Sequence, residues 1–111
     1  MQKDDSIRIR HMLDAAREAV SFVQNKRGSS LAKDRKLTLA LVKSIEIVGE
    51  AAAKVTPKTR EELSQIPWSN IIGMRNRLIH AYYDINLDIL WKTVTEDLPP
   101  LIAELEQIVP L

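Results

Sequence analysis

The chain has 111 residues, of which 45% are hydrophobic and 28% are charged, and it contains no cysteine. This length and apolar content predict a single domain over residues 1–111 with a modest core, and they leave no room for a second domain. The lack of cysteine excludes disulfides, thiolate catalysis and zinc sites of the cysteine type. Because the sequence has neither an N-terminal apolar signal segment nor an apolar run of about 18 residues, we expect a soluble, cytoplasmic protein without a membrane partner.

The formal net charge is only +1, but the charges are distributed unevenly. Residues 1–60 hold 13 Lys and Arg against 7 Asp and Glu, a balance of +6, whereas residues 61–111 hold 3 against 8, a balance of −5. Such an asymmetry could support a polar association or a basic approach surface for phosphates. It could equally reflect two solvated helix faces of opposite sign.

The first predicted helix has Asp5 or Ser6 as its N-cap. Its apolar residues recur at helical spacing and form one stripe, made of Ile9, Leu13, Ala16, Val20 and Val23. The polar segment 24–30, which contains a glycine, ends the helix. His11 lies off the stripe; it could be a second acid–base group, but we favour an exposed surface histidine.

The second predicted helix begins after Asp34 as N-cap and runs to about Val55. Its core stripe consists of Leu37, Leu41, Ile45, Val48, Ala52 and Val55. Gly49 and the alanines that follow it make one end slim enough for another helix or a partner chain to approach closely. Glu46 and Glu50 are one turn apart, a spacing that could ligate a metal in a bundle, but no Glu-x-x-His follows. We therefore favour solvated or ion-paired carboxylates.

Residues 54–65 form a predicted connection in which Thr59 caps a short helical turn over 60–64. The last helix is predicted to begin at Asn86. Its apolar residues, Leu87, Leu90, Val94, Leu98, Leu101, Leu105 and Ile108, keep one phase through Pro99 and Pro100. This continuity predicts one kinked helix or two stacked segments.

The segment 67–84 gathers an arginine, an amide, an imidazole and two phenols within nine residues. Its apolar spacing predicts one helix from Ser69 as N-cap to about Tyr83, weakened at Gly73. On such a helix Asn76 and His80 share a face, whereas Arg75 and His80 diverge by about 140°. A good site would therefore need two such helices related by a two-fold axis.

Arg75, followed after four residues by His80 and after one more by Tyr82, resembles the signature of the HepT-like toxins of the HEPN ribonuclease superfamily. Gly73-Met74 before the arginine and Asn76 directly after it agree with this pattern. Further matches extend over almost the whole chain: RHMLDAA at 10–16, EIVGEAA at 46–52, IPW at 66–68 and DLP at 97–99. An arginine and a histidine five apart are weak evidence alone, but the matches in order make the resemblance specific.

The expected fold is an all-α, up-and-down bundle of four long helices with a short fifth helical turn. The resemblance agrees with this class and adds a homodimer with both signature helices near the interface. It also implies an endoribonuclease toxin that cuts RNA, with tRNA or mRNA as the expected classes. In this family a partner minimal nucleotidyltransferase acts as antitoxin and attaches AMP to a tyrosine, which corresponds to Tyr82.

The residue chemistry is compatible with metal-independent RNA cleavage, without any cofactor. His80 titrates near neutral pH and can act as general base or acid, while Arg75 can hold non-bridging phosphate oxygens bidentately. Asn76 is expected to orient His80 or bind substrate, and Arg77 to contact phosphate or solvent. Each AMP on Tyr82 would bring negative charge and bulk beside Arg75.

Two other interpretations remain open at this point. One is a non-enzymatic helical partner that binds nucleotide or positions a nucleotidyltransferase. The other is purely structural: Arg75 as an ion-pair residue, His80 as a helix-end histidine and Tyr82 as an interface aromatic. For Tyr83, we expect a packing role.

Overall fold

The computed structural model describes residues 1–81 and 84–109, and it leaves the side chains of residues 80 and 81 undescribed. The elements are α1 (Lys3–Phe22), α2 (Ser30–Lys33), α3 (Arg35–Lys54), α4 (Pro57–Glu62), α5 (Trp68–Ile72), α6 (Met74–Leu78), β1 (Ile79–Ala81), β2 (Asp84–Ile85), α7 (Leu87–Lys92), a π-helical turn (Thr93–Asp97) and α8 (Leu98–Ile108). The expected all-α class is confirmed, and one short antiparallel hairpin, β1–β2, interrupts it.

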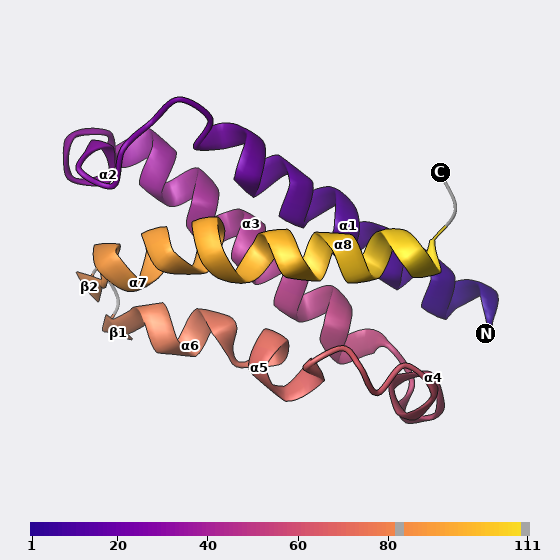
Figure 1. Ribbon diagram of the computed structural model, residues 1–111. Helices are drawn as coiled ribbons and strands as arrows, with labels where there is room; N and C mark the ends of the chain where they lie inside the picture. Colours follow the sequence, from indigo (N-terminus) through magenta and orange to yellow (C-terminus); the bar gives the residue numbers. More distant parts are fainter. Residues whose placement is uncertain (82–83, 110–111) are drawn as a thin grey trace.

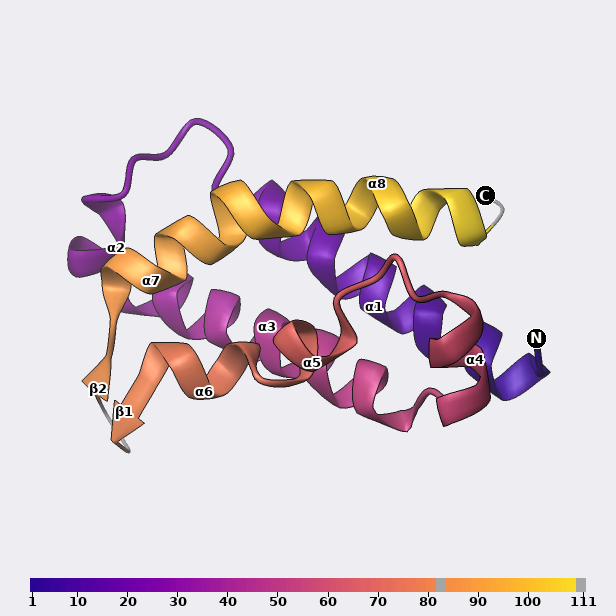
Figure 2. The ribbon, with the colours of Figure 1, turned by 60° about the horizontal axis from the view of Figure 1, so that its bottom comes forward.

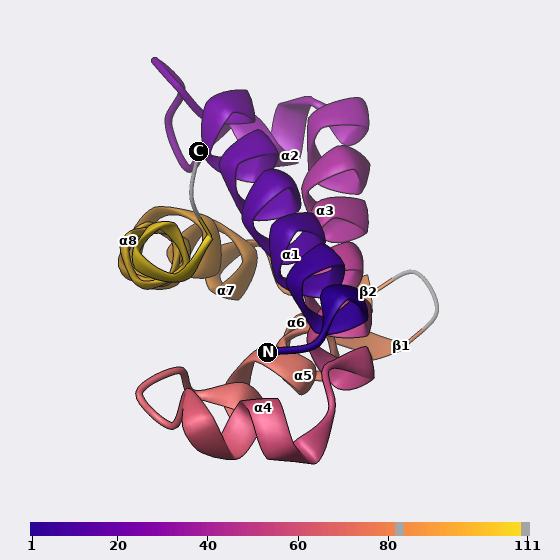
Figure 3. The ribbon, with the colours of Figure 1, turned by 90° about the vertical axis from the view of Figure 1, so that its right-hand side faces the viewer.

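The main elements alternate in direction along one axis. Helix α1 runs from one end of the molecule to the other, α3 returns, the α5–α6 pair runs back, and α7–α8 returns again (Figures 1 and 2). The start of α1, helix α4 and the end of α8 lie at one end, while α2 and the hairpin lie at the other. Seen along the axis, α1 lies between α3 and α8, and the hairpin extends outward on the side away from α8 (Figure 3).

Helix α1 begins earlier than predicted. Its first residue is Lys3 and its N-cap is Gln2, so neither Asp5 nor Ser6 caps it. Asp5 is instead 1% exposed and accepts hydrogen bonds from the Thr56 backbone N–H at 3.0 Å, from the Thr56 hydroxyl at 2.7 Å and from the Thr59 hydroxyl. Thr59 therefore does not cap a helical turn as predicted; α4 begins at Pro57, and Thr59 fixes it to α1.

Helix α3 forms as predicted. The Asp34 side chain accepts a hydrogen bond from the Leu37 backbone N–H at 3.1 Å, and the helix ends at Lys54. Gly49 confirms the expected close approach: a Cβ built there would lie 3.4 Å from the Ile71 carbonyl oxygen and 3.5 Å from that of Ile72. The glycine thus lets the α5 backbone lie directly against α3.

The last helix is continuous from Leu87 to Ile108, as its apolar phase predicts. Asn86 caps it by accepting from the Ile89 backbone N–H at 3.0 Å. Pro99 and Pro100 lack the N–H groups that would bond to the preceding turn, and the π-helical turn ends at Asp97, two residues before Pro99. The helix therefore absorbs the two prolines by widening locally, without a loop.

One hydrophobic core lies between these elements. Helices α1, α3, α5–α6 and α7–α8 all contribute fully buried side chains, among them Ile9, Leu13, Leu41, Ile45, Ile71, Leu78, Leu90, Leu98 and Leu105. His11, by contrast, is exposed on α1, as expected. In the described part of the chain, no helix has the length and apolar character needed to cross a membrane.

Candidate functional site

The signature segment does not form the single helix predicted for it. Gly73, with φ −86° and ψ 0°, separates α5 from α6. The Asn76 backbone N–H donates a hydrogen bond to the Gly73 carbonyl oxygen at 3.1 Å. Helix α6 then ends at Leu78, five residues before the predicted end. Helix α5 begins at Trp68 with Pro67 as its N-cap, so Ser69 does not cap it as predicted. The described residues thus form three long helical elements and a fourth that is broken in two.

The helix ends at Leu78 because the hairpin competes for the backbone that follows. Ile79 pairs with Ile85, Ala81 pairs with Asp84, and the Asn86 N–H donates to the Leu78 carbonyl at 2.7 Å. These bonds place residues 79–81 in extended backbone and lead directly into the cap of α7. Hairpin and cap together therefore override the helical periodicity of the segment.

This break changes the expected arrangement of the signature residues. The backbone of His80 lies in β1, so Asn76 and His80 are not on one face of a continuous helix, and that prediction is wrong. The side chain of His80 and all of Tyr82 and Tyr83 lie outside the described residues. Their predicted roles stay predictions.

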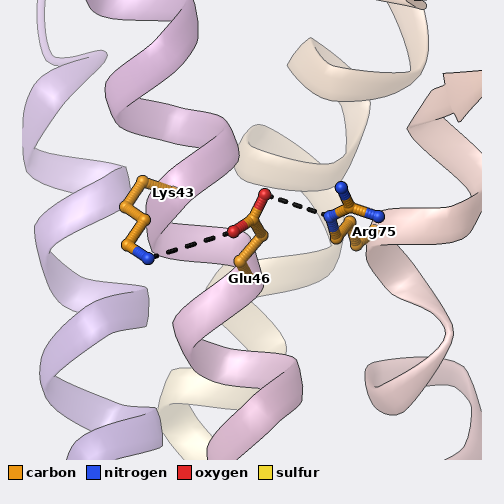
Figure 4. A network of polar contacts seen from close by, with 3 residues as sticks. All are labelled: Lys43, Glu46 and Arg75. Atoms are coloured by element: carbon orange, nitrogen blue, oxygen red, sulfur yellow. Dashed lines mark hydrogen bonds and ion pairs between the residues drawn. The ribbon is translucent and has the colours of Figure 1, made fainter. Parts of the chain in front are cut away.

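Arg75 lies on α6 with its side chain 49% exposed, and it is held from α3. Its Nε–H donates to Glu46 Oε1 at 3.0 Å. The other carboxylate oxygen, Glu46 Oε2, lies 4.0 Å from Lys43 Nζ one helical turn earlier. Figure 4 shows Glu46 between the two cations, with the terminal nitrogens of Arg75 beyond its bonded Nε. We refer to these three residues as the Lys43–Glu46–Arg75 network.

Asn76 and Arg77, the two residues that follow Arg75, are also exposed. Arg77 lines a cavity of about 450 Å³ between α5–α6 and the start of α8, together with Glu96 and Asp97. Arg77 therefore points elsewhere than Arg75, and its predicted contact with phosphate or solvent stays a prediction. The expected support of His80 by Asn76 stays a prediction, because the side chain of His80 lies outside the described residues.

Sequence reasoning correctly predicted that Glu46 is solvated or ion-paired, but it missed both of its partners. The i, i+3 spacing of Lys43 and Glu46 was a readable signal for their pairing. The contact from Glu46 to Arg75 spans 29 positions and depends on how α6 packs on α3, which no local pattern reveals. In the described side chains, no group of three or more His, Cys, Asp or Glu residues could hold a metal ion.

Comparison with known proteins identifies the family. A family model described as ribonuclease HepT-like matches residues 12–108, almost the whole chain. The chain belongs to the HepT-like ribonuclease family. That membership supports the expected enzyme class, an endoribonuclease.

Three relatives illustrate how far the similarity extends. "Putative RNase TTE0752" of Caldanaerobacter subterraneus subsp. tengcongensis is 35% identical over 100 residues, covering 90% of this chain and 89% of that protein. "Putative RNase MJ1380" of Methanocaldococcus jannaschii is 32% identical, covering 86% and 87%. "Probable ribonuclease HepT" of Thermococcus cleftensis is 37% identical over 75 residues, covering 68% of each chain. No solved structure gives a significant match to this chain.

Proposed function

We propose that this chain is a metal-independent endoribonuclease toxin that cuts RNA, with tRNA and mRNA as the candidate classes. Arg75 and His80 form its catalytic centre, which two chains complete at a homodimer interface. Membership of the HepT-like family supports the activity. The half-exposed guanidinium of Arg75, held through its Nε by Glu46, is the structural observation that supports the site.

The proposed reaction requires three events at one phosphodiester. A base takes the proton of the 2′-hydroxyl, the 2′-oxygen forms a bond to phosphorus, and the bond from phosphorus to the 5′-oxygen breaks as that oxygen receives a proton. His80 supplies one of the two proton transfers, an effect typically worth about 10² to 10⁴ in rate. A second chain offers a second histidine for the other transfer, which gives a chemical reason for the dimer.

Arg75 stabilises the charge that develops on the non-bridging oxygens. Its Nε–H is occupied by Glu46. The terminal amino groups, which carry the other four N–H donors of a guanidinium, lie beyond that bond (Figure 4). Two of these N–H groups can bind two oxygens of one phosphate in parallel, and such a contact strengthens as negative charge accumulates.

The proposed antitoxin is a minimal nucleotidyltransferase that attaches AMP to Tyr82. The tyrosine follows His80 by two residues in the sequence. A phosphodiester added there would place negative charge near Arg75 and compete with RNA for it.

Cleavage products and intact mass test this proposal directly. The purified protein should cut RNA in the presence of EDTA and leave 2′,3′-cyclic phosphate ends, and cells expressing it alone should stop growing. Coexpression with the neighbouring reading frame should add mass in units of AMP on the peptide containing Tyr82. If cells grow normally in both cases and the mass is unchanged, the chain is instead a non-enzymatic partner of a nucleotidyltransferase.

A further inference from the structure

The proposed site contains one cationic side chain from the signature segment, but the structure places a second cation beside it. Lys43 projects from α3 with 66% of its side chain exposed, and its Nζ lies 4.0 Å from the carboxylate that holds Arg75. Lys43 is no part of the signature around Arg75 and comes from an element 32 positions earlier in the chain. This juxtaposition requires an explanation that the signature residues do not give.

We infer that Lys43 is a second phosphate-binding residue beside Arg75, and that Glu46 is the positioning residue that holds Arg75 toward the RNA backbone. The inference rests on the proposed function, because it assigns further residues to the same substrate. It extends the RNA path from α6 onto the outer face of α3.

The charges of the network favour an anion. Two cations share one carboxylate, so the network keeps a net charge of +1 after its internal pairing. Helix α3 as a whole carries four Lys and Arg against two Glu, so the helix itself has a net charge of +2. A polyanion can therefore approach the network without meeting net repulsion.

The two contacts of Glu46 differ in a way that suits two roles. The contact with Arg75 is a 3.0 Å hydrogen bond to a side chain that is only half exposed, so it fixes the direction of the guanidinium plane. The contact with Lys43 is long, at 4.0 Å, and joins a flexible, exposed ammonium. Exposed ion pairs of this kind are weak and exchange readily, so Lys43 can leave Glu46 for a phosphate oxygen.

The two roles predict different kinetic effects. Replacing Lys43→Ala should raise the RNA dissociation constant roughly three- to fivefold and leave kcat unchanged, because it removes one exposed phosphate contact. The slope of log affinity against log salt should become shallower by about 0.7. Replacing Glu46→Ala should lower kcat about tenfold without weakening RNA binding, because Arg75 stays charged but loses its orientation.

Binding and cleavage should be measured separately in the same variants. A 2′-O-methyl RNA oligonucleotide cannot be cleaved by 2′-hydroxyl attack, so fluorescence anisotropy with it reports binding alone. Lys58→Ala is the matched control, since it removes the same charge from the exposed face of α4 at the other end of the molecule (Figure 1). Glu46→Gln should restore kcat to within about threefold of wild type, because its amide oxygen can still accept the Nε–H of Arg75.

The outcomes separate this inference from the proposed function. Equal affinity and salt slope for Lys43→Ala and Lys58→Ala would overturn the role of Lys43. A Glu46→Gln variant as slow as Glu46→Ala, or parallel losses of kcat and binding, would overturn the positioning role. A wild-type protein that cuts no RNA but binds the 2′-O-methyl oligonucleotide through Lys43 would contradict the ribonuclease proposal and support this binding surface.

Discussion

Asp5 links the first helix to α4, and replacing it should destabilise the protein more than its place near the start of the chain suggests. The carboxylate accepts one backbone and two hydroxyl hydrogen bonds, and its side chain is buried. Asp5→Ala leaves those donors without their acceptor. At about 1 kcal/mol per hydrogen bond, the loss is about 3 kcal/mol, or roughly 13 °C in Tm for a domain of this size.

The same contact predicts a pH dependence. The hydrogen bonds from Thr59 and then Thr56 lower the pKa of Asp5 below its ordinary value of 3.8. Because the folded-state pKa is depressed, the stabilisation is fully present above about pH 4 and is lost as the pH falls from 3.8 through the folded-state pKa. The difference in free energy of unfolding between wild type and Asp5→Ala should therefore be constant from pH 5 to 8 and shrink below pH 4.

Urea denaturation at pH 7 and pH 3, followed by circular dichroism, measures both effects. Asp4→Ala is the control, because Asp4 is exposed in the same first turn and its removal should cost less than about 1 kcal/mol. The reasoning is refuted if Asp5→Ala costs no more than Asp4→Ala, or if its cost is the same at both pH values.

Two further substitutions test packing and capping. Gly49→Val should lower the free energy of unfolding, measured by urea denaturation, by about 1–3 kcal/mol, because the branched side chain must displace the α5 backbone. Gly49→Ala should be tolerated, because its Cβ meets the Ile71 carbonyl oxygen at an ordinary 3.4 Å. Equal stability of the two variants would contradict this. Asn86→Ala should lower Tm by about 4 °C, because the helix loses roughly 1 kcal/mol of capping energy. Asn86→Asp should keep wild-type stability, because Asp is an equally good N-cap. An Asp variant as unstable as the Ala variant would argue against the cap.

Much of the fold could be predicted because local signals and tertiary packing agree. Asp34 and Asn86 cap the helices that their positions predict, and the last helix keeps its apolar phase through two prolines. Where the prediction failed, contacts between residues far apart in the sequence determined the structure. Asp5 has the residue type of an N-cap, but Thr56 and Thr59, more than 50 positions later, bury it as an acceptor.

The candidate site shows the same limit. The spacing of Arg75, His80 and Tyr82 identified the family, which the comparison confirms. Helical periodicity nevertheless gave the wrong backbone for His80, because cross-strand pairing of Ile79 with Ile85 outweighs the local preference. The contact between Glu46 and Arg75 depends on the packing of α6 against α3, so only the structure could show it.

The proposed catalytic centre is tested by the single-turnover rate of RNA cleavage in EDTA for wild type, Arg75→Ala and His80→Ala, with His11→Ala as the matched histidine control. We expect at least a roughly 10²-fold loss of rate for Arg75→Ala and for His80→Ala. The rate of His11→Ala should be unchanged, because His11 is exposed on α1 and lies outside the proposed site. Cleavage by His80→Ala or Arg75→Ala at the wild-type rate would contradict the proposed catalytic centre.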